Sequence, residues 1–289
     1  MRFVSPLRYP GGKRKLAEFV RDTLAANGIV DGTYIEPFAG GASIAISLLN
    51  GEHVSRVIIN DVDRSIYAFW YAVLNHPDEL CRRIDEAQVN METWEKQRMV
   101  QQRKSDADMV DLAFSTFFLN RTNRSGILRG GVIGGKAQRG PWVMDARFNK
   151  ADLIRRIDRI ALYKERIELH CEDAIVFLDG IRSQIDSDTL AYLDPPYYHQ
   201  GSALYMNYYE PRDHERLAYH IQNMKHKWIL TYDYAPEVID MYAWAKKRLL
   251  SLSYTAGRKT RAYEMIAFSD DLLIPEGSYS SISIDSIPV

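Results

Sequence analysis

The chain has 289 residues, of which 46% are hydrophobic and 26% are charged, and its formal net charge is −1. This composition is that of an ordinary globular protein and excludes a disordered chain, a collagen and a coiled coil. Charges interrupt every apolar run well before the roughly 18 residues that a membrane span needs, so we expect no membrane partner. The two cysteines are too few for a disulfide framework or a zinc cluster. Together with the lack of a signal-peptide core, they predict a cytoplasmic protein that holds no metal.

The spacing of apolar residues predicts strands and helices in alternation. Strands are expected at residues 34–36, 57–59, 167–170, 190–193, 228–232, 249–254 and 263–268. Helices are expected at residues 16–24, 42–50, 108–120, 151–163, 174–181, 213–224 and 236–244, with another that ends before residue 76. The first six strands are separated by helices, which implies parallel pairing with right-handed crossovers.

The last two strands are joined by residues 255–262 alone. A parallel crossover needs about a dozen residues or more, so the seventh strand should run antiparallel. We therefore expect an α/β fold with a doubly wound, seven-stranded, mostly parallel sheet. Residues 1–76 and 149–276 should form its two parts, residues 77–148 an insertion between strands two and three, and residues 277–289 a loose tail.

The end of the predicted insertion is basic and rich in glycine. Residues 121–148 contain six of the 17 glycines, which predicts a hairpin or an irregular loop. Residues 1–17, 120–140 and 246–262 carry lysines and arginines without any acidic residue. A single run of this kind is usually a solvated face, but three in a nearly neutral chain indicate a local surface for a polyanion.

A turn with two glycines follows the first predicted strand, at residues 36–42. Glycine lets the backbone approach a ligand there, and the next helix begins with free N–H groups. The dehydrogenase fingerprint is not matched because Phe38 occupies its first glycine position, and Gly40-Gly41 alone fits tight packing equally well. Asp61 ends the second strand, where a carboxylate can accept hydrogen bonds from both ribose hydroxyls. The two features favour a ligand with an adenosine-like ribose, the alternative being that Asp61 caps the next helix.

The residues Asp194-Pro195-Pro196-Tyr197 follow the fourth predicted strand. They should lie at the carboxyl edge of the sheet, where this strand runs beside the first and where such sheets bind ligands. Two prolines fix φ and hold the carbonyls of Asp194 and Pro195 outward, so a carboxylate and a carbonyl can accept both hydrogens of one amino group. Tyr197 adds a flat aromatic face. An ordinary turn after a strand is the alternative.

This arrangement suits methyl transfer to an amino group on an aromatic ring. Such a nitrogen is a poor nucleophile because its lone pair is delocalised. Two acceptors outside the ring plane draw it toward tetrahedral geometry, and an electron-rich pocket tolerates the positive charge that develops on it. The electrophile should be a methyl group on a sulfonium whose adenosine fits beside Gly40 and Asp61.

Three motifs together resemble the Dam-type, α-class adenine-N6 DNA methyltransferases. They are LRYPGGK at residues 7–13, FAGG at residues 38–41 and DPPY at residues 194–197. The matching motifs run from Leu7 to about Phe268 in the order of that class, and its target-recognition insertion falls where this chain breaks its alternation. The resemblance implies a Rossmann-like methyltransferase fold, S-adenosylmethionine as cofactor, double-stranded DNA as substrate, and base flipping. It leaves open whether a restriction enzyme is a partner.

Carried over by position, the resemblance also implies the roles of individual residues. The catalytic residues would be Asp194, Pro195, Pro196 and Tyr197. The residues around the cofactor would be Tyr9, Lys13, Glu36, Phe38, Gly40, Gly41, Asp61, Asp173 and Asp194. The residues that contact DNA would be Asn120, Arg121, Asn123, Arg124, Arg129, Lys136, Gln138, Arg139, Arg258 and Lys259.

Within that DNA-contacting set, Asn123, Arg124, Arg129 and Gln138 are candidates for reading base edges, although each arginine could equally contact a phosphate. Residues 130–140 do not match the hairpin that reads GATC, which leaves the recognition sequence open. A tyrosine-rich loop, with Tyr197, Tyr198, Tyr205, Tyr208 and Tyr209, is expected to close over the flipped base, and residues 256–261 to hold the backbone beside it.

Three alternatives belong to other classes of activity. The same chemistry on an RNA base or on N4 of cytosine is disfavoured by the basic insertion and by the motif of Tyr9 and Lys13. A catalytically inactive DNA-binding module is disfavoured by the intact Asp-Pro-Pro-Tyr motif. A nicotinamide dehydrogenase is disfavoured by Phe38 in the glycine position.

Overall fold

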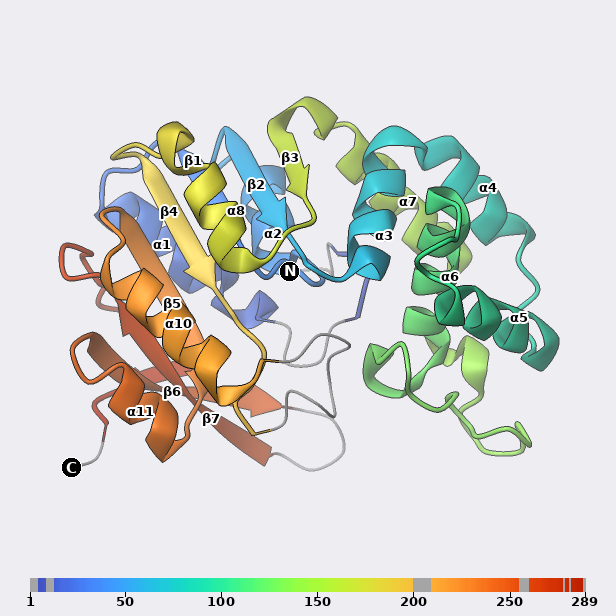
Figure 1. Ribbon diagram of the computed structural model, residues 1–289. Coiled ribbons are helices and arrows are strands. Elements are labelled where there is room, and N and C mark those ends of the chain that lie inside the picture. Colours follow the sequence, from blue (N-terminus) through green and yellow to red (C-terminus); the bar gives the residue numbers. More distant parts are fainter. Residues whose placement is uncertain are drawn as a thin grey trace.

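The computed structural model describes residues 5–8, 13–199, 209–254, 260–277, 279–280 and 282–287. Over these residues the strands form a single sheet in the order β3-β2-β1-β4-β5-β7-β6-β8 (Figure 1). The strands are β1 (Thr33–Glu36), β2 (Arg56–Asn60), β3 (Ile167–His170), β4 (Thr189–Leu193), β5 (Lys227–Asp233), β6 (Lys246–Tyr254), β7 (Thr260–Phe268) and β8 (Ile282–Asp285). The α/β fold with a mostly parallel sheet is confirmed.

The strand directions follow from the lengths of the connections. β1, β2, β3, β4 and β5 pair in parallel, and β7 runs antiparallel between β5 and β6. The antiparallel seventh strand is therefore confirmed. The expectation of seven strands and a loose tail was wrong, because β8 pairs antiparallel with the edge of β6. Ile282 is buried there and Ile284 packs against the core, so these two side chains hold the segment on the sheet.

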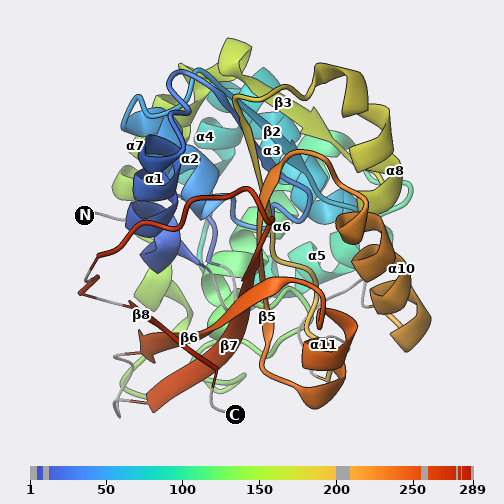
Figure 2. The ribbon, with the colours of Figure 1, turned by 90° about the vertical axis from the view of Figure 1, so that its left-hand side faces the viewer.

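Both faces of the sheet are covered because successive side chains of each strand point to opposite sides. Tyr34 of β1 lies in one hydrophobic cluster and the next residue, Ile35, lies in the other. The first cluster includes residues of α1 (Ala17–Ala26), α2 (Ser43–Asn50) and α3 (Arg64–Asn75). The second includes residues of α8 (Ala174–Gly180), α10 (Pro211–Gln222) and α11 (Pro236–Met241). Figure 2 shows α1 and α2 on one side of the strands and α8 and α10 on the other.

The helices that interrupt the alternation gather beside the β3 edge of the sheet (Figure 1). They are α4 (Pro77–Glu86), α5 (Met91–Gln102) and α6 (Met109–Thr122), and α7 (Lys150–Ala161) leads back to β3. Phe117 of α6 stacks on Phe69 of α3 with ring centroids 6.2 Å apart, so the hydrophobic core continues from the sheet into the insertion. No helix in the described part of the chain is both long and apolar enough to traverse a bilayer.

The basic, glycine-rich segment after α6 is an irregular loop and not a hairpin. Residues 121–148, all of them described, contain no strand, and one isolated bridge joins Asn123 to Val132. Gly126, Gly134 and Gly135 take φ values of +80°, +81° and +71°, in the left-handed region that side chains other than glycine rarely adopt. The chain therefore turns repeatedly before a strand can extend.

Candidate active site

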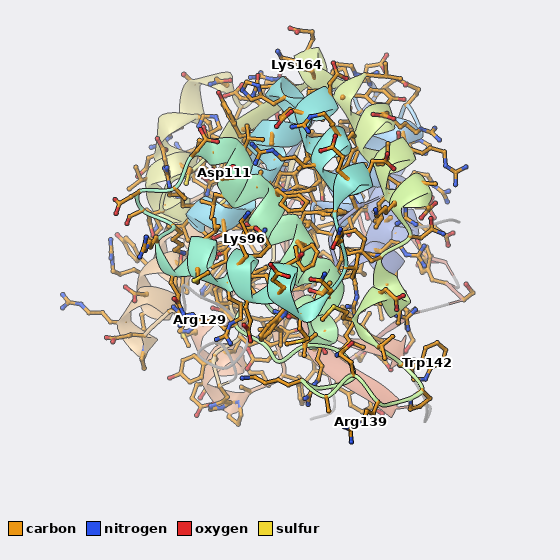
Figure 3. All side chains as sticks on the ribbon, turned by 90° about the vertical axis from the view of Figure 1, so that its right-hand side faces the viewer. Lys96, Asp111, Arg129, Arg139, Trp142 and Lys164 are labelled. Atoms are coloured by element: carbon orange, nitrogen blue, oxygen red, sulfur yellow. The ribbon has the colours of Figure 1, made fainter. Side chains whose placement is uncertain are left out.

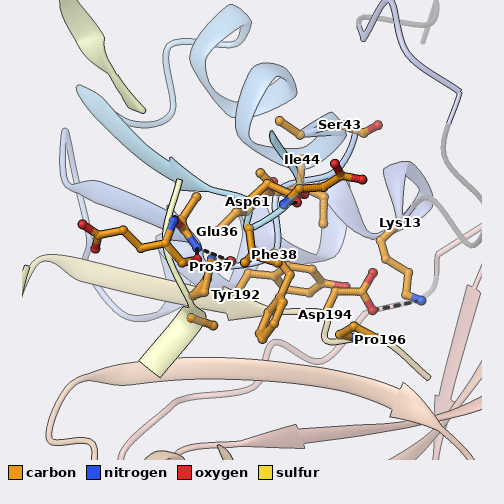
Figure 4. Close-up of a pocket in the computed structure, with 18 of the residues that line it drawn as sticks. Lys13, Glu36, Pro37, Phe38, Ser43, Ile44, Asp61, Tyr192, Asp194 and Pro196 are labelled. Carbon is orange, nitrogen blue, oxygen red and sulfur yellow. Dashed lines mark hydrogen bonds and ion pairs between the residues drawn. The ribbon is translucent and has the colours of Figure 1, made fainter. Parts of the chain in front are cut away.

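The site lies at the carboxyl edge of β1 and β4, which are parallel neighbours in register from Thr33 and Thr189 onward. The turns that follow these two strands therefore meet, and they enclose a pocket (Figure 4). Its volume is about 860 Å³ with the solvent at its mouth included. The expected residues that line it are Lys13, Glu36, Phe38, Gly41, Asp61, Asp194 and Pro196.

Asp61 organises the glycine turn on one side of the pocket. Its Oδ2 accepts a hydrogen bond of 2.9 Å from the backbone N of Gly40, and its Oδ1 accepts one of 2.9 Å from the backbone N of Asp63. Gly40 has a φ of +46°, a conformation for which glycine is suited. The alternative that Asp61 caps the next helix was wrong, because the N-cap of α3 is Asp63, which accepts from the backbone N of Ser65 at 2.9 Å.

Two buried carboxyl groups face the pocket with raised pKa values. Burial raises the pKa of Glu36 to about 8, and Oε1 of this residue accepts hydrogen bonds of 3.1 Å from the hydroxyl of Tyr34 and the backbone N of Ala45. Burial, with a contribution from Asp63, raises the pKa of Asp61 to about 7. A cationic ligand would therefore be favoured here, since it offsets the cost of burying both carboxylates.

The charged residues that line the pocket indicate which kind of ligand it can bind. Acidic residues line it at Glu36, Asp61, Asp63, Glu172 and Asp194. Lys13 is the single cation among the described lining residues, and it is paired with acids. A sulfonium with an amino group and a ribose would find hydrogen-bond acceptors and negative charge in such a lining. The residues present therefore fit S-adenosylmethionine.

Asp194 has one oxygen anchored and one oxygen without a partner in the described structure. Its Oδ1 accepts a hydrogen bond of 2.8 Å from the hydroxyl of Thr231 and lies 3.2 Å from Nζ of Lys13. Its Oδ2 receives no hydrogen bond from the described residues. The side chain is 24% exposed, so a substrate amino group can reach it. The carboxylate is thereby held in one orientation with an acceptor directed outward.

Lys13 contacts Asp194 directly and joins it to Tyr197 and to Glu264 of β7. Lys13 Nζ lies 2.8 Å from Oε2 of Glu264 and donates a hydrogen bond of 3.2 Å to the hydroxyl of Tyr197. That hydroxyl in turn donates a hydrogen bond of 2.8 Å to Oε1 of Glu264. Burial alone would lower the pKa of Lys13, but Asp194 and Glu264 outweigh it and raise this pKa well above its ordinary value. Lys13 therefore stays protonated beside Asp194.

Three cofactor residues expected from the sequence are not placed in the pocket. Gly40 does not line it and donates its backbone N–H to Asp61. Tyr9 lies outside the described residues. Asp173 does not line the pocket; it is the N-cap of α8, and its Oδ1 accepts from the backbone N of Ile175 at 3.0 Å. Its neighbours Glu172 and Ala174 line the pocket instead. The cap gives Asp173 a structural role, and the lining of the pocket gives no support to the contact with the cofactor that was expected of it.

Three residues expected to contact DNA are engaged inside the protein. Asn120 is buried. Its Oδ1 accepts a hydrogen bond of 2.7 Å from the backbone N of Arg8, and its Nδ2 donates one of 3.0 Å to the backbone O of Gly126. The fully buried Asn123 accepts 2.7 Å from Nε1 of Trp94. Gln138 donates to the backbone O of Ile133 at 2.8 Å and accepts from the backbone N of Met144 at 2.9 Å. These side chains hold the loop together, so the structure gives no support to the DNA contacts expected of them, nor to base reading by Asn123 and Gln138.

The remaining basic residues of the insertion differ in exposure. Arg121 is partly buried and donates a hydrogen bond of 2.7 Å to the backbone O of Arg147, so its guanidinium is engaged within the protein. The exposed ones are Arg124, Arg129, Lys136 and Arg139. Figure 3 shows Arg129 and Arg139 at one end of the insertion, together with Trp142, whose side chain is 72% exposed. Arg258 and Lys259 lie outside the described residues, as do Tyr205 and Tyr208 of the tyrosine-rich loop.

Sequence reasoning missed Glu264, Thr231 and Trp142. Glu264 interrupts the apolar run of the seventh predicted strand, and a charge within a buried strand is a signal that it has a partner. Thr231 carries no comparable signal, because threonine is common in strands. Trp142 lies two residues after the last glycine of the segment, and its position in the sequence does not indicate that its side chain is exposed.

Comparisons with known proteins identify the family of this chain. Residues 9–262 match the family D12 class N6 adenine-specific DNA methyltransferase. The chain is 22% identical to the type II methyltransferase M.MjaIII of Methanocaldococcus jannaschii over 66% of this chain and 68% of that protein. It is 24% identical to the type II methyltransferase M.CviBI of Paramecium bursaria Chlorella virus NC1A over 82% of this chain and 86% of that protein. A structure from Pyrococcus horikoshii, provisionally named an RNA methyltransferase, covers 91% of this chain with 12% identity and a TM-score of 0.41. With the match extending over most of its length, this chain belongs to the D12 class N6 adenine-specific DNA methyltransferases.

Proposed function

We propose that this protein transfers a methyl group from S-adenosylmethionine to N6 of an adenine within a specific sequence of double-stranded DNA. The target base would leave the duplex and enter the space beside Asp194 and Tyr197. The observation that carries this proposal is the environment of Asp194, which lines the pocket with a side chain that is 24% exposed and has Oδ1 anchored by Thr231 and Lys13.

In the proposed reaction, Oδ2 of Asp194 and the carbonyl oxygen of Pro195 accept the two hydrogens of the adenine amino group. Because both acceptors hold these hydrogens out of the ring plane, the nitrogen lone pair becomes available for attack. As the new N–C bond forms, positive charge grows on N6, and the carboxylate of Asp194 stabilises it. The same carboxylate is placed to accept the proton that N6 loses. Tyr197, fixed by its hydroxyl, packs against the ring.

When bound, S-adenosylmethionine supplies a methyl group activated by its sulfonium. The pocket residues have roles that fit this ligand. Asp61 would accept from the ribose hydroxyls, Glu36 would face the positive charge of the methionine part, and Phe38 would pack along it. Tyr209, whose ring centroid is 6.0 Å from that of Phe38, closes the same side of the pocket. Pre-formed acceptors reduce the reorganisation that binding requires.

The exposed end of the insertion, with Arg129, Arg139 and Trp142, is proposed to contact the duplex, as is the exposed Lys136. Lysine and arginine there would bind phosphates, which offsets the cost of a few kcal/mol for unstacking the target base. Trp142 offers an aromatic face that can pack on a base or a sugar. Arg124, also exposed, remains a candidate for a base or phosphate contact.

The test is to incubate the protein with DNA duplexes and labelled S-adenosylmethionine, and then to identify the modified nucleoside by mass spectrometry. N6-methyladenine, formed by the wild type and absent with Asp194→Ala, is the expected product. N4-methylcytosine, or methylation of RNA alone, would contradict the proposal. Sequencing DNA from a host that expresses the protein, against a non-expressing host, would give the recognition sequence.

A further inference from the structure

Glu264 is a charged residue in the interior of the sheet. It lies in the middle of β7, in register with Asp233 of β5 and Leu250 of β6, and its exposure is only 4%. Burying an ionised carboxylate is costly unless it is paired and hydrogen-bonded. A side chain that only had to fill this position in a strand would be apolar, so the carboxylate requires an explanation from its contacts.

Its contacts are with the two residues that flank Asp194. Oε2 lies 2.8 Å from Nζ of Lys13, and Oε1 accepts 2.8 Å from the hydroxyl of Tyr197. Lys13 Nζ is also 3.2 Å from that hydroxyl and 3.2 Å from Oδ1 of Asp194. Lys13, Glu264 and Tyr197 therefore contact one another in a ring, and Asp194 is joined to this ring through Lys13. Lys13 is 4% exposed, which excludes most of the water that could otherwise solvate the ammonium.

We infer that Glu264 is a positioning residue for methyl transfer, which holds the phenol of Tyr197 in place and shares the ammonium of Lys13 with Asp194. The inference rests on the proposed function. Glu264 does not line the pocket, so it would act through its neighbours and not by touching the substrate or the cofactor.

The charge argument concerns the acceptor strength of Asp194. An ammonium that paired with Asp194 alone would draw electron density from the carboxylate that has to stabilise positive charge on N6. With Glu264 present, two carboxylates share one ammonium, and the network keeps a net negative charge next to the reacting nitrogen. Preorganised charge of this sign lowers the barrier because it requires no rearrangement during the reaction.

The geometric argument concerns Tyr197. A phenol held at its hydroxyl by both Lys13 and Glu264 cannot swing about its Cα–Cβ bond without breaking two hydrogen bonds. The ring therefore presents a fixed surface to the base. A fixed surface matters because small displacements of a reacting group from its productive position reduce the rate strongly.

Glu264→Gln separates these two contributions, since glutamine keeps an acceptor for Tyr197 but removes the shared charge. We expect its single-turnover rate of methyl transfer to fall about 10- to 100-fold, while KM for S-adenosylmethionine and for DNA stays near that of the wild type. Glu264→Asp, which keeps the charge on a shorter side chain, should recover part of the rate. Glu276→Gln makes the same chemical change at an exposed position and should behave as the wild type.

A further variant shows whether Glu264 acts through Lys13. In a Lys13→Met background the substitution Glu264→Gln should cost less than it does in the wild type, because no ammonium remains to be shared. Thermal unfolding of each variant checks that it is folded. If Glu264→Gln does not fold, the rates of Glu264→Asp and Tyr197→Phe are compared with that of the wild type instead.

The inference would be overturned if folded Glu264→Gln transferred the methyl group at the wild-type rate, or if the substitution raised KM and left the rate unchanged. Equal losses in the two backgrounds would also overturn it. If the wild type itself methylates no DNA adenine, the proposed function fails instead, and the two failures are thereby distinguished.

Discussion

The hydroxyl of Thr231 on β5 donates a hydrogen bond of 2.8 Å to Oδ1 of Asp194, which follows the neighbouring strand β4. The same hydroxyl is 2.7 Å from that of Tyr192, which lines the pocket. A strand that contributes no residue to the Asp-Pro-Pro-Tyr motif thus determines how the carboxylate of that motif is oriented.

Thr231→Val should lower the rate of methylation. Valine has the same shape, but it leaves Oδ1 of Asp194 without its hydroxyl donor, and removing one such bond costs about 0.5–3 kcal/mol. We expect a loss of about tenfold in the single-turnover rate, since 1.4 kcal/mol corresponds to a factor of ten. Thr231→Ser, which keeps the hydroxyl, is the matched control. Equal rates for valine and serine variants would show that the bond is without consequence.

Asp194→Ala should abolish methyl transfer and preserve the fold. The acceptor for the amino group is lost, and the loss of one such group typically costs about 100- to 1000-fold. Lys13 keeps Glu264 as its partner, so no charge is left buried without a counterion. Rates from quenched-flow assays and circular dichroism would measure the two effects. Turnover near that of the wild type would remove Asp194 from its proposed role.

The affinity for S-adenosylmethionine should rise with pH between pH 6 and 9. A raised pKa means that Asp61 (about 7) and Glu36 (about 8) are largely protonated at the lower end of this range. A cationic ligand with hydroxyl donors binds the ionised forms, so affinity increases as pH rises through the two pKa values and falls as pH drops below them. Calorimetric titrations at several pH values would follow this dependence.

Substitutions of Asp61 and of Glu36 should each remove one part of the increase in affinity for S-adenosylmethionine with pH. Asp61→Asn removes the group that titrates at the lower pH, and Glu36→Gln removes the one that titrates at the higher pH. Each variant should bind more weakly at pH 9 than the wild type and show a flatter profile. An affinity that does not respond to pH in the wild type would contradict the assignment of both carboxyl groups.

Arg139→Ala should weaken DNA binding in a salt-dependent way. Each phosphate contact that is lost reduces the slope of log K against log salt by about one. Trp142→Ala should weaken binding without changing that slope, because an aromatic contact releases no counterion. Fluorescence anisotropy at several salt concentrations would measure both. Lys164→Ala, at the opposite end of the same face (Figure 3), should leave affinity and slope unchanged.

Asn123→Ala should destabilise the protein. The side chain donates to the backbone O of Ile127 at 2.9 Å and of Leu128 at 3.0 Å and accepts from Trp94, so the substitution leaves buried polar groups unsatisfied. We expect a loss of about 1–3 kcal/mol in the free energy of unfolding, measured by urea denaturation. Unchanged stability with altered sequence specificity would instead support the original expectation of base reading.

The sequence by itself determined the local features of this protein. Alternating strands and helices predicted the parallel strands, and a short connection predicted the antiparallel β7. The Asp194–Tyr197 motif with Asp61 predicted where the pocket lies. These features depend on neighbours in the chain, such as two prolines in a turn or a glycine before a helix. They are therefore encoded within a few residues of one another.

The tertiary structure alone decided which side chains meet across the sheet and which ones are buried. Glu264 reaches Lys13 over 251 residues of chain, and Thr231 reaches Asp194 from the adjacent strand. Asn120 and Asn123 have residue types suited to reading bases, yet α6 directs them into the protein. The pairing register of distant strands and the rotation of a packed helix set these outcomes. Both depend on packing across the whole core, which no local pattern of residues contains.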